Sequence, residues 1–579
     1  MLRQIAGLIA GLSMAFAAHA VSAQTATTQQ GSGDWLGGLA ISPTVTLHVA
    51  IHIHKDAAGL QTGSFDSLDQ GVYDLPLADV STAGGALAFT VPKLHATYAG
   101  KWDAVSHAWS GQWAQGDRSI VLTLVSGETP AAPVVAGLDG DWDGALTVSG
   151  GMKLRLALHV ETGAHGTMAR LNSIDRQSVL AISSLSRTGD KVRIEAKLIG
   201  AVYEAALDAK GQTLAGTWTQ GGMPLALVLR RRGAGQVEAM LRRPQTPVKP
   251  YPYHEEEVAF EDAAGHAKLA GTLTLPAGAG PFPAVVLVSG SGPNTRNEPI
   301  MAHQLFLVLA DHLTRHGIAV LRYDKRGTGA STGDYAKATT QDFANDADAA
   351  AAWLRGRKEI DPGKVGLIGH SEGGLIVPMV AVADPKVDFI VMMAGPGVRG
   401  DKVLSEQGRL ITKAMGLSDE KVADSSALRD QMIAIVRTEK DPVVAAAKMR
   451  ALVARDPKQK DAPQAVVEAQ IATMNTDWFR FFFNYDPAPA LRQVKCPVLA
   501  MIGSKDLQVP PDQNLPAIRA ALAGNPDVEV DEPPGLNHLF QTAKTGAPGE
   551  YGEIEETMSP LALDTMTAWI AKHVGPPAH

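Results

Sequence analysis

The chain has a single cysteine, Cys496, among its 579 residues. This excludes an intrachain disulfide and any zinc or iron–sulfur site built from several cysteines. Charged residues make up only 19% of the chain and hydrophobic residues 45%. That balance excludes a mainly disordered protein, because disordered chains are poor in apolar residues and rich in charge. The formal net charge of −8 offers no positive field to a phosphate backbone and argues against nucleic acid as a partner.

Long hydrophobic runs are also missing, except at the N-terminus. Residues 5–18 are apolar, follow Arg3, and precede small residues at Ala20 and Ala23. This is the pattern of a secretory signal, and the run is shorter than the ~20 residues of a membrane-spanning helix. We predict a signal peptide over 1–23, cleaved after Ala23 or Ala20, with an uncleaved anchor as the alternative. The mature protein is expected to be periplasmic or secreted, with no membrane span.

The N-terminal part contains an internal repeat. The hexapeptide 111–116 (GQWAQG) matches 216–221 (GTWTQG), an offset of 105 (216 − 111) that Tyr98 and Tyr203 share. Alternation of apolar and polar residues in this part predicts β-strands. Each copy is expected to form short antiparallel strands in a closed or nearly closed sheet, which hides the sheet's edges.

These observations predict the domain boundaries. The two β domains span 24–135 and 136–243, and a linker follows at 244–254. The linker contains four prolines, which favour extended backbone and cannot donate ladder hydrogen bonds. The remaining domain spans 255–579.

No metal site is predicted. His48, His52 and His54 alternate along one strand and share a face, and His159 occupies the position of His52 in the second copy. A metal site is one interpretation of this pattern, but a solvated polar face is the preferred one.

The pattern changes after the linker, where short apolar strands alternate with helices. Such strands, for example 284–288, 365–368 and 498–502, predict a mostly parallel sheet covered by helices on both faces. Helix-rich sequence at about 400–490 interrupts the alternation. This insertion is expected to form a helical cap over the carboxyl edge of the sheet.

The pentapeptide 369–373 (GHSEG) matches the G-x-S-x-G motif. It follows the strand 365–368 and precedes an apolar, helical stretch, which is the setting of a nucleophile elbow. Ser371 is therefore the predicted nucleophile, and an ordinary strand–helix turn is the alternative. A serine hydroxyl needs a base to take its proton.

The base and its orienting acid should follow in the order Ser, Asp/Glu, His. Asp506 comes just after the strand 498–502, and His538 just after a strand near 528–530. Both loops leave the same sheet edge as Ser371, where such sites form. The alternatives are a turn or cap residue for Asp506 and a loop histidine for His538. Asp401 is the other candidate for the acid.

Acyl transfer also needs hydrogen-bond donors for the oxyanion. The backbone N–H of Glu372, directly after the nucleophile, is one predicted donor. The other is expected from the loop 289–293 (SGSGP), with the Ser291 N–H favoured over that of Gly290. An ordinary glycine-rich loop is the alternative, whereas a phosphate-binding loop is excluded by the missing G-K-[ST] ending.

Substrate contacts are predicted for His370, Gly290, Trp478 and Phe482. The last two lie in the aromatic segment 478–483 (WFRFFF), which either lines an acyl pocket or packs the cap onto the sheet.

Residues 255–575 resemble the serine-dependent α/β-hydrolase superfamily. The similarity is closest to secreted bacterial carboxylesterases and to related serine aminopeptidase-like and acyl-thioester hydrolase-like proteins. The stretches that carry it are 288–293 (VSGSGP), 323–329 (YDKRGTG), 369–374 (GHSEGG), 394–397 (AGPG) and 535–538 (GLNH). The resemblance implies Ser371 as nucleophile, Asp506 as acid and His538 as base. Many relatives begin the oxyanion loop with histidine, where this chain has Ser289.

The sequence thus predicts a multi-domain protein in which two repeated antiparallel β domains precede an α/β-hydrolase. Its expected function is that of a secreted serine carboxylesterase, which cleaves small-molecule esters through an acyl-enzyme and needs no cofactor. A serine peptidase or aminopeptidase with the same triad is one alternative. A protein that binds a glycan or an envelope component through its β repeats is the other.

Overall fold

The computed structural model of the protein describes residues 32–42, 45–56, 59–115, 118–148, 152–176, 178–233, 242–456 and 464–575. The predicted signal peptide, 1–23, lies outside these residues. The described residues form two compact units. The first comprises those up to Leu68 and from Val72 to Pro130, and the second comprises 69–71 and those from Ala131 onward. Within the described residues, no helix has the length and apolar character needed to cross a membrane.

The first unit contains a nine-stranded antiparallel sheet of order β4-β3-β2-β1-β9-β8-β7-β6-β5. Its strands are β1 (Gly33–Ser42), β2 (Val45–Lys55), β3 (Gln61–Ser67), β4 (Val72–Pro76), β5 (Ala78–Ser81), β6 (Ala86–Val91), β7 (Ala96–Asp103), β8 (Ala108–Gln115) and β9 (Arg118–Ser126). The two edge strands, β4 and β5, follow each other directly in the chain. The sheet therefore curls back on itself, and alternate apolar side chains fill its interior.

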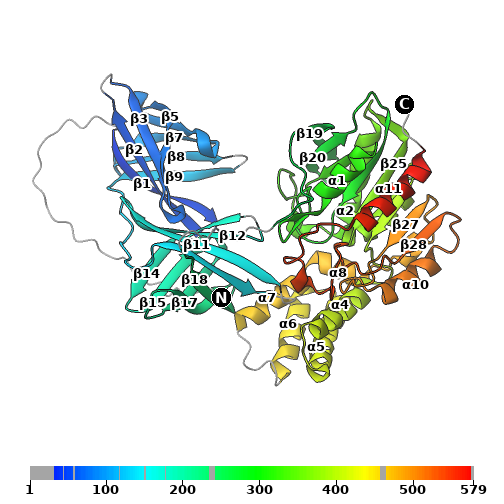
Figure 1. Cartoon of the computed structure of the whole chain (residues 1–579). Helices are drawn as coiled ribbons and strands as arrows, with labels where there is room; N and C mark the ends of the chain where they lie inside the picture. The colour runs from blue at the N-terminus through cyan, green and yellow to red at the C-terminus, as the bar shows by residue number, and fades with distance from the viewer. Residues whose placement is uncertain are drawn as a thin grey trace, which may run out of the picture. The chain divides into compact units, whose positions relative to one another are not determined.

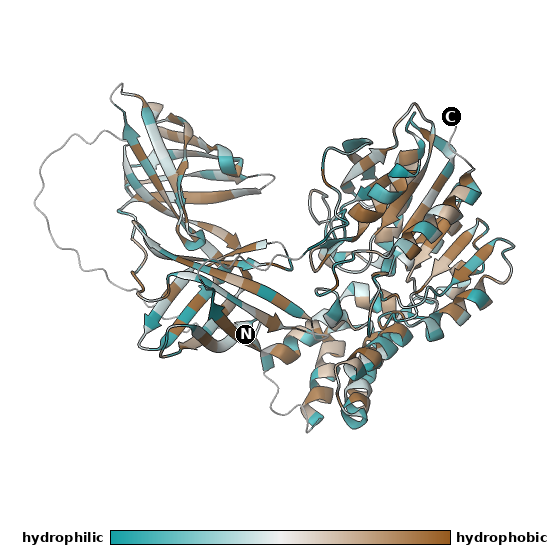
Figure 2. Ribbon diagram, viewed as in Figure 1, coloured by the Kyte–Doolittle hydropathy of each residue, from teal (hydrophilic) through white to brown (hydrophobic). Residues whose placement is uncertain are grey.

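The second β repeat has the same strand order, β13-β12-β11-β10-β18-β17-β16-β15-β14. Its strands are β10 (Gly140–Thr147), β11 (Lys153–Gly163), β12 (Gly166–Ser173), β13 (Ser178–Ala181), β14 (Ser184–Thr188), β15 (Lys191–Ala196), β16 (Ala201–Leu207), β17 (Thr213–Gln220) and β18 (Met223–Arg231). Figure 2 shows the alternation of hydrophilic and hydrophobic residues along β11. The internal repeat in the sequence thus corresponds to a repeated sheet topology (Figure 1).

Buried tyrosines explain part of the repeat. The Tyr98 hydroxyl lies within hydrogen-bond distance of the carbonyl oxygens of Trp109 and Leu122, at 3.2 and 3.3 Å. The Tyr203 hydroxyl lies 2.8 and 3.1 Å from the equivalent carbonyls of Leu214 and Leu227. These contacts tie β7 to β8 and β9, and β16 to β17 and β18.

The repeated histidines also have equivalent partners. His52 Nδ1 lies 2.7 Å from Asp34 Oδ1, and His159 Nδ1 lies 2.7 Å from Asp141 Oδ1. Each pair joins neighbouring strands on the outer, partly exposed face of its sheet. Among the described residues, no cluster of three or more His, Cys, Asp or Glu side chains is arranged to hold a metal ion.

The proline-rich linker is fixed to the last domain. The Arg243 guanidinium donates to the carbonyl oxygens of Met301 and Ile554, at 2.8 and 3.1 Å. The Gln245 side chain donates to the Met558 carbonyl at 2.7 Å and accepts from the Met558 N–H at 3.0 Å. Because proline lacks an N–H, the segment cannot extend a sheet, and these long polar side chains make its contacts instead.

The last domain is built on an eight-stranded sheet of order β19-β20-β24-β21-β25-β26-β27-β28. Its strands are β19 (His254–Asp262), β20 (Ala267–Leu275), β21 (Phe282–Val288), β24 (Ala319–Tyr323), β25 (Ile360–His370), β26 (Ile390–Met393), β27 (Val498–Met501) and β28 (Val528–Asp531). Six neighbouring strands run parallel to one another, namely β24, β21, β25, β26, β27 and β28. β20 is antiparallel to both of its neighbours, β19 and β24. A small hairpin, β22 (Pro299–Ile300) and β23 (His303–Gln304), follows β21.

Helices cover both faces of this sheet, as the continuous apolar strands predict. Alternate residues of β21 enter two separate cores: Val285 and Leu287 face one, and Ala284 and Val286 the other. Helices α1 (Leu305–Arg315) and α11 (Pro560–Val574) close the first core, and α2 (Thr340–Arg355), α3 (Glu372–Ala383) and α10 (Pro511–Ala521) close the second. The sheet with its flanking helices is seen in green to red in Figure 1.

The cap comprises helices inserted between β26 and β27. They are α4 (Gly400–Ala414), α5 (Asp419–Thr438), α6 (Pro442–Arg455), α7 (Gln464–Met474), α8 (Asp477–Asn484) and α9 (Ala488–Leu491). Helices α5 and α6 are separated by residues 439–441. Asp441 caps a new helix by accepting from the Val443 N–H, and Pro442 stands at its first position.

Candidate active site

Four loops meet at the carboxyl edge of the parallel sheet. The loop after β21 contains Ser291, Ser371 follows β25, Asp506 follows β27, and His538 follows β28. Parallel strands all end at the same edge, so residues that are far apart in the chain converge there.

Ser371 lies on a sharp turn between β25 and α3. Its φ angle is 54°, in the left-handed region that non-glycine residues rarely adopt. The turn is held by a 2.8 Å hydrogen bond from the Ser371 N–H to the Met393 carbonyl on β26. A Cβ atom at Gly369 or Gly373 would collide with backbone: at Gly369 with the Gly373 carbonyl, and at Gly373 with the Val288 carbonyl. The flanking glycines thus allow β21 and the elbow to lie in close contact.

Asp506 and His538 form a buried pair. His538 Nδ1 lies 2.8 Å from Asp506 Oδ2, and both side chains are almost completely buried. The other carboxylate oxygen, Oδ1, accepts hydrogen bonds from the N–H groups of Gln508 and Val509, both at 2.8 Å. Because three donors fix the carboxylate, it can hold the imidazole in one orientation.

The loop after β21 is held by a buried carboxylate that the sequence did not reveal. Glu298 is 1% exposed, and its Oε1 accepts a 2.7 Å hydrogen bond from the Gly290 N–H. The Gly290 N–H is therefore already used in a hydrogen bond to Glu298. Ser291, the next residue, lines the cavity at Ser371. Of the two predicted donors in this loop, Ser291 is therefore the one that the geometry favours.

His370 is buried, and both of its ring nitrogens contact other residues. Its Nδ1 is 3.0 Å from Glu298 Oε1, and its Nε2 is 3.0 Å from the backbone carbonyl of His538. Burial alone would lower the pKa of His370, but the Glu298 carboxylate outweighs it and raises the pKa above its ordinary value. With both ring nitrogens engaged, His370 connects the oxyanion loop to the loop of His538.

The Glu372 side chain joins three parts of the domain. Its Oε1 accepts from Thr340 Oγ1 at 2.7 Å and from the Trp478 indole N–H on cap helix α8 at 2.6 Å. Its Oε2 lies 3.0 Å from Lys325 Nζ, which also donates to the Gly290 carbonyl at 2.7 Å. Lys325 and Glu372 are both nearly inaccessible to water. The Lys325–Glu372 pair therefore connects the turn at Ser371, the loop after β21 and cap helix α8.

Replacing Lys325 by Met is expected to lower the free energy of unfolding of this domain by about 3–5 kcal/mol, because it leaves the Glu372 carboxylate buried without its cation. The measurement is the guanidinium midpoint, followed by hydrogen exchange in peptides from β21 and β25. Lys337→Met is the matched control, since Lys337 pairs with Asp334 on the exposed surface and should change the midpoint little. Equal midpoints for the two variants would contradict the prediction.

A small cavity, here called the inner chamber, opens on Ser371. Its volume is about 60 Å³. It is lined by Ser291, Ser371, Glu372, Pro396, Val403, Leu404, Gln407, Trp478, Phe482, Gln508 and Val509. Of the predicted substrate contacts, Trp478 and Phe482 therefore line the chamber, with their rings stacked at 5.1 Å between centroids. His370 and Gly290 are not part of this lining.

A larger apolar cavity, the outer groove, adjoins the inner chamber and has a volume of about 570 Å³. Its lining consists of Met152, Ile300, Leu404, Gln407, Gly408, Ile411, Thr412, Met415, Arg429, Ile433, Met474, Phe479, Phe483, Gln508, Leu539, Pro548 and Tyr551. The two cavities share Leu404, Gln407 and Gln508. A polar chain marks the junction: Gln407 Nε2 donates to Gln508 Oε1 at 3.1 Å, and Gln508 Nε2 to the Tyr551 hydroxyl at 2.9 Å.

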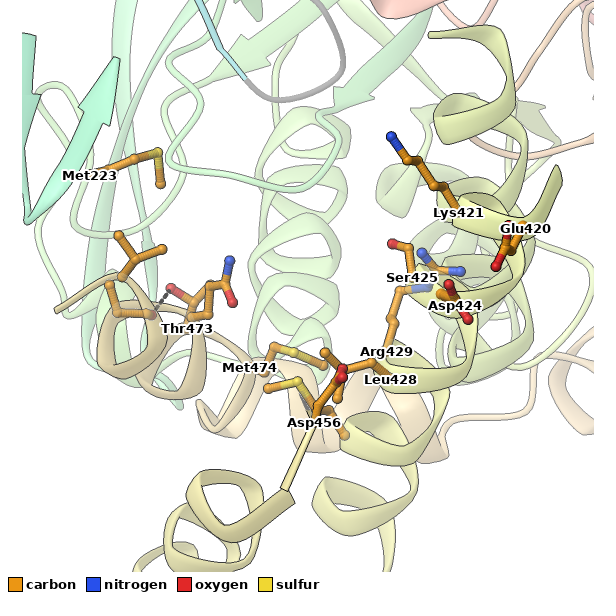
Figure 3. A pocket seen from close by; sticks show the side chains of 14 residues that line it. Met223, Glu420, Lys421, Asp424, Ser425, Leu428, Arg429, Asp456, Thr473 and Met474 are labelled. Carbon is orange, nitrogen blue, oxygen red and sulfur yellow. Dashed lines mark hydrogen bonds between the residues drawn. The ribbon is translucent and has the colours of Figure 1, made fainter. Parts of the chain in front are cut away.

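A third cavity, of about 840 Å³, lies farther out along the cap. Figure 3 shows Lys421 and Ser425 of α5 on one side of it and Thr473 of α7 on the other. This cavity shares Arg429 and Met474 with the outer groove. The three cavities thus adjoin one another in sequence through shared lining residues.

Comparisons with known proteins agree with this architecture. Residues 264–524 match the sequence model of the X-Pro dipeptidyl-peptidase (S15) family. The chain is 26% identical to the esterase EstD of Thermotoga maritima over 329 residues, which cover 56% of this chain and 69% of EstD. The family match and the similarity to EstD support a serine hydrolase of the α/β-hydrolase superfamily.

Two solved structures are similar to this α/β-hydrolase. The Pyrococcus furiosus esterase Pf2001 is 14% identical, with a TM-score of 0.35, over 58% of this chain and 98% of that one. Est1E of Butyrivibrio proteoclasticus, solved with ferulic acid, is 14% identical, with a TM-score of 0.33, over 55% and 99%.

The sequence did not predict the contacts of three side chains at this site: Glu298, Lys325 and the carboxylate of Glu372. Lys325 lies in the stretch 323–329, which resembles the superfamily, but that resemblance did not indicate what Lys325 does. Glu298 lies in a loop with no recognisable pattern. Its contacts with Gly290 and His370 span 8 and 72 residues, and no local rule links these positions.

Proposed function

We propose that the protein is a serine carboxylesterase. Ser371 attacks the ester carbonyl, and His538 takes the hydroxyl proton and returns it to the leaving alcohol. Asp506 holds the imidazole, and the amides of Glu372 and Ser291 stabilise the oxyanion. The N–H of Glu372 is suited to this role because it opens helix α3, where the first amides have no partner within the helix.

The observation that carries this proposal is the buried His538–Asp506 pair, at 2.8 Å, on the same sheet edge as the strained Ser371. A strained nucleophile turn is typical of functional sites, since the surrounding fold must hold it in place. The relationship to EstD supports an ester as the substrate.

A serine peptidase is the second candidate, because the family whose sequence model matches residues 264–524 includes X-Pro dipeptidyl-peptidases. An enzyme that reads a free peptide N-terminus needs a carboxylate for the ammonium group. Among the described residues that line the inner chamber, Glu372 is the one carboxylate, and its oxygens are committed to Lys325, Thr340 and Trp478. In the outer groove, Arg429 is the one charged side chain of the described lining. Because these described lining residues offer no available carboxylate, they favour an uncharged ester over a peptide with a free ammonium group as the substrate.

The test compares hydrolysis of p-nitrophenyl acetate with that of alanyl-prolyl p-nitroanilide, after labelling with a fluorophosphonate. We expect labelling of the peptide that contains Ser371, and kcat/KM for the ester at least 100-fold above that for the anilide. Preference for the anilide would replace the esterase proposal with the peptidase, and absence of labelling would exclude both.

The proposal places the enzyme in the periplasm or outside the cell, on the basis of the signal pattern over 1–23. N-terminal sequencing of the protein from a periplasmic extract tests this, and a mature N-terminus after Ala23 or Ala20 is expected.

A further inference from the structure

The two cavities at the active site differ about tenfold in volume. We propose that the enzyme is specific for esters that join a short acyl group to a long apolar alcohol. The acyl group occupies the inner chamber, and the alcohol chain lies in the outer groove. This inference rests on the proposed esterase function.

The inner chamber belongs to the oxyanion side of Ser371. Ser291 and Glu372, whose amides are the proposed oxyanion donors, line the chamber but not the outer groove. The chamber is closed by Trp478 and Phe482 of the cap. The Trp478 indole is fixed by its hydrogen bond to Glu372, so this wall cannot easily retreat. A volume of about 60 Å³ is far below the ~300–1,000 Å³ of a pocket for a whole small molecule, and suits a group of two or three carbons.

The outer groove lies next to the loop that carries His538. Its lining includes Leu539, directly after His538, and Tyr551, but neither residue lines the inner chamber. His538 Nδ1 faces Asp506, so Nε2 is the nitrogen that exchanges the proton. The leaving oxygen must receive its proton from Nε2, and the alcohol therefore leaves on this side. The groove is apolar and, at about 570 Å³, has room for a chain of eight or more carbons.

The junction between the cavities suits the start of the alcohol chain. Gln407 and Gln508, which are shared by both cavities and hydrogen-bonded to each other, line the passage that the alcohol would take from Ser371 into the groove. Buried polar groups of this kind fix the orientation of a ligand, while the apolar walls supply most of the binding free energy.

The chemistry balances without a co-reactant. Ser371 Oγ forms a bond to the acyl carbon as the carbon–oxygen bond to the alcohol breaks, and the serine proton passes through His538 to the alcohol. Water then cleaves the acyl-enzyme, releasing the short carboxylic acid and restoring the serine hydroxyl.

A pair of isomeric esters tests the assignment. Octyl acetate and ethyl octanoate have the same atoms and similar hydrophobicity, but exchange the long chain between alcohol and acyl group. We expect kcat/KM for octyl acetate to exceed that for ethyl octanoate at least tenfold, measured as acid release at constant pH below the solubility limit of each ester. Equal rates, or a preference for ethyl octanoate, would overturn the assignment.

Two variants test whether each cavity accounts for its part of the substrate preference. Phe482→Ala enlarges the inner chamber and should shift the isomer ratio at least fivefold toward ethyl octanoate. Ile411→Asp places a charge in the outer groove and should lower the ratio of octyl acetate to ethyl acetate hydrolysis at least tenfold. Val443→Asp is the matched control, because Val443 is 75% exposed on α6, outside both cavities, and should leave these ratios unchanged. Unchanged ratios in Phe482→Ala and Ile411→Asp would contradict the assignment.

Ethyl acetate and p-nitrophenyl acetate separate failure of this inference from failure of the proposed function. If the wild-type enzyme hydrolyses none of the four esters, the esterase proposal itself is wrong, and the assignment of the two cavities is wrong as well. If it hydrolyses the small acetates but prefers ethyl octanoate to octyl acetate, only the assignment is wrong.

Discussion

Ser371→Ala is expected to reduce ester hydrolysis by at least about 10⁴-fold while leaving the fold intact. Without the hydroxyl no acyl-enzyme forms, and the rate that remains is that of a substrate held by the oxyanion donors, ~10³–10⁴-fold above water. Alanine retains the Cβ of serine, so it tolerates the φ of 54° neither better nor worse than serine does. The measurement is kcat/KM on p-nitrophenyl acetate, with circular dichroism to verify the fold.

Ser291→Ala is the matched comparison, since this serine lines the same chamber. Its proposed role is carried by the backbone N–H, which alanine keeps, and the loss should stay below tenfold. Fluorophosphonate labelling should disappear in Ser371→Ala and persist in Ser291→Ala. A Ser371→Ala enzyme that is folded and retains a tenth of the wild-type rate would remove Ser371 from the mechanism.

Asp506→Asn is expected to lower kcat by about 10⁴-fold, with a much smaller change in KM. The reason lies in the three donors around the carboxylate. Oδ1 accepts from two backbone N–H groups, of Gln508 and Val509, so the carbonyl oxygen of an asparagine must take that position. Its NH₂ group then faces His538 Nδ1, which can only accept. The imidazole proton is forced onto Nε2, the nitrogen that must take the proton of Ser371.

Asp401→Asn is the control for this prediction. Asp401 was the other candidate for the acid, but the structure places it between Arg399 and Arg437, with contacts of 2.7 Å to each. Its substitution should leave kcat within about threefold of wild type. Comparison of kcat and KM for the two variants is the measurement, and a nearly silent Asp506→Asn would assign the orienting role to another carboxylate.

Much of the architecture around the candidate site could be predicted because it depends on local sequence. Short apolar strands required burial on both faces, which implied a parallel sheet with helices on either side. In a parallel sheet the carboxyl ends of β25, β27 and β28 had to lie at one edge. Ser371, Asp506 and His538 each follow such a strand. The offset of 105 residues between the β copies likewise predicted the repeated sheet, since equivalent strands need equivalent apolar positions.

Other features could not be predicted because they depend on contacts between distant segments. Glu372 was recognised for its backbone N–H, yet its carboxylate meets Lys325, Thr340 and Trp478, which lie 32 to 106 residues away. Buried charges are costly unless they are paired, but the sequence does not state which partners meet.

By itself, therefore, the sequence determined the order of the β repeats and the α/β domain, the class of fold and the residues that follow β25, β27 and β28, because periodicity and turn chemistry act over a few residues. Only the tertiary structure decided that Glu298 engages the Gly290 amide, that the start of the linker is fixed through Arg243 and Gln245, and that a small chamber at Ser371 adjoins a large apolar groove. These features arise from side chains that meet across loops and helices, where packing and paired charges, rather than local preference, select one arrangement.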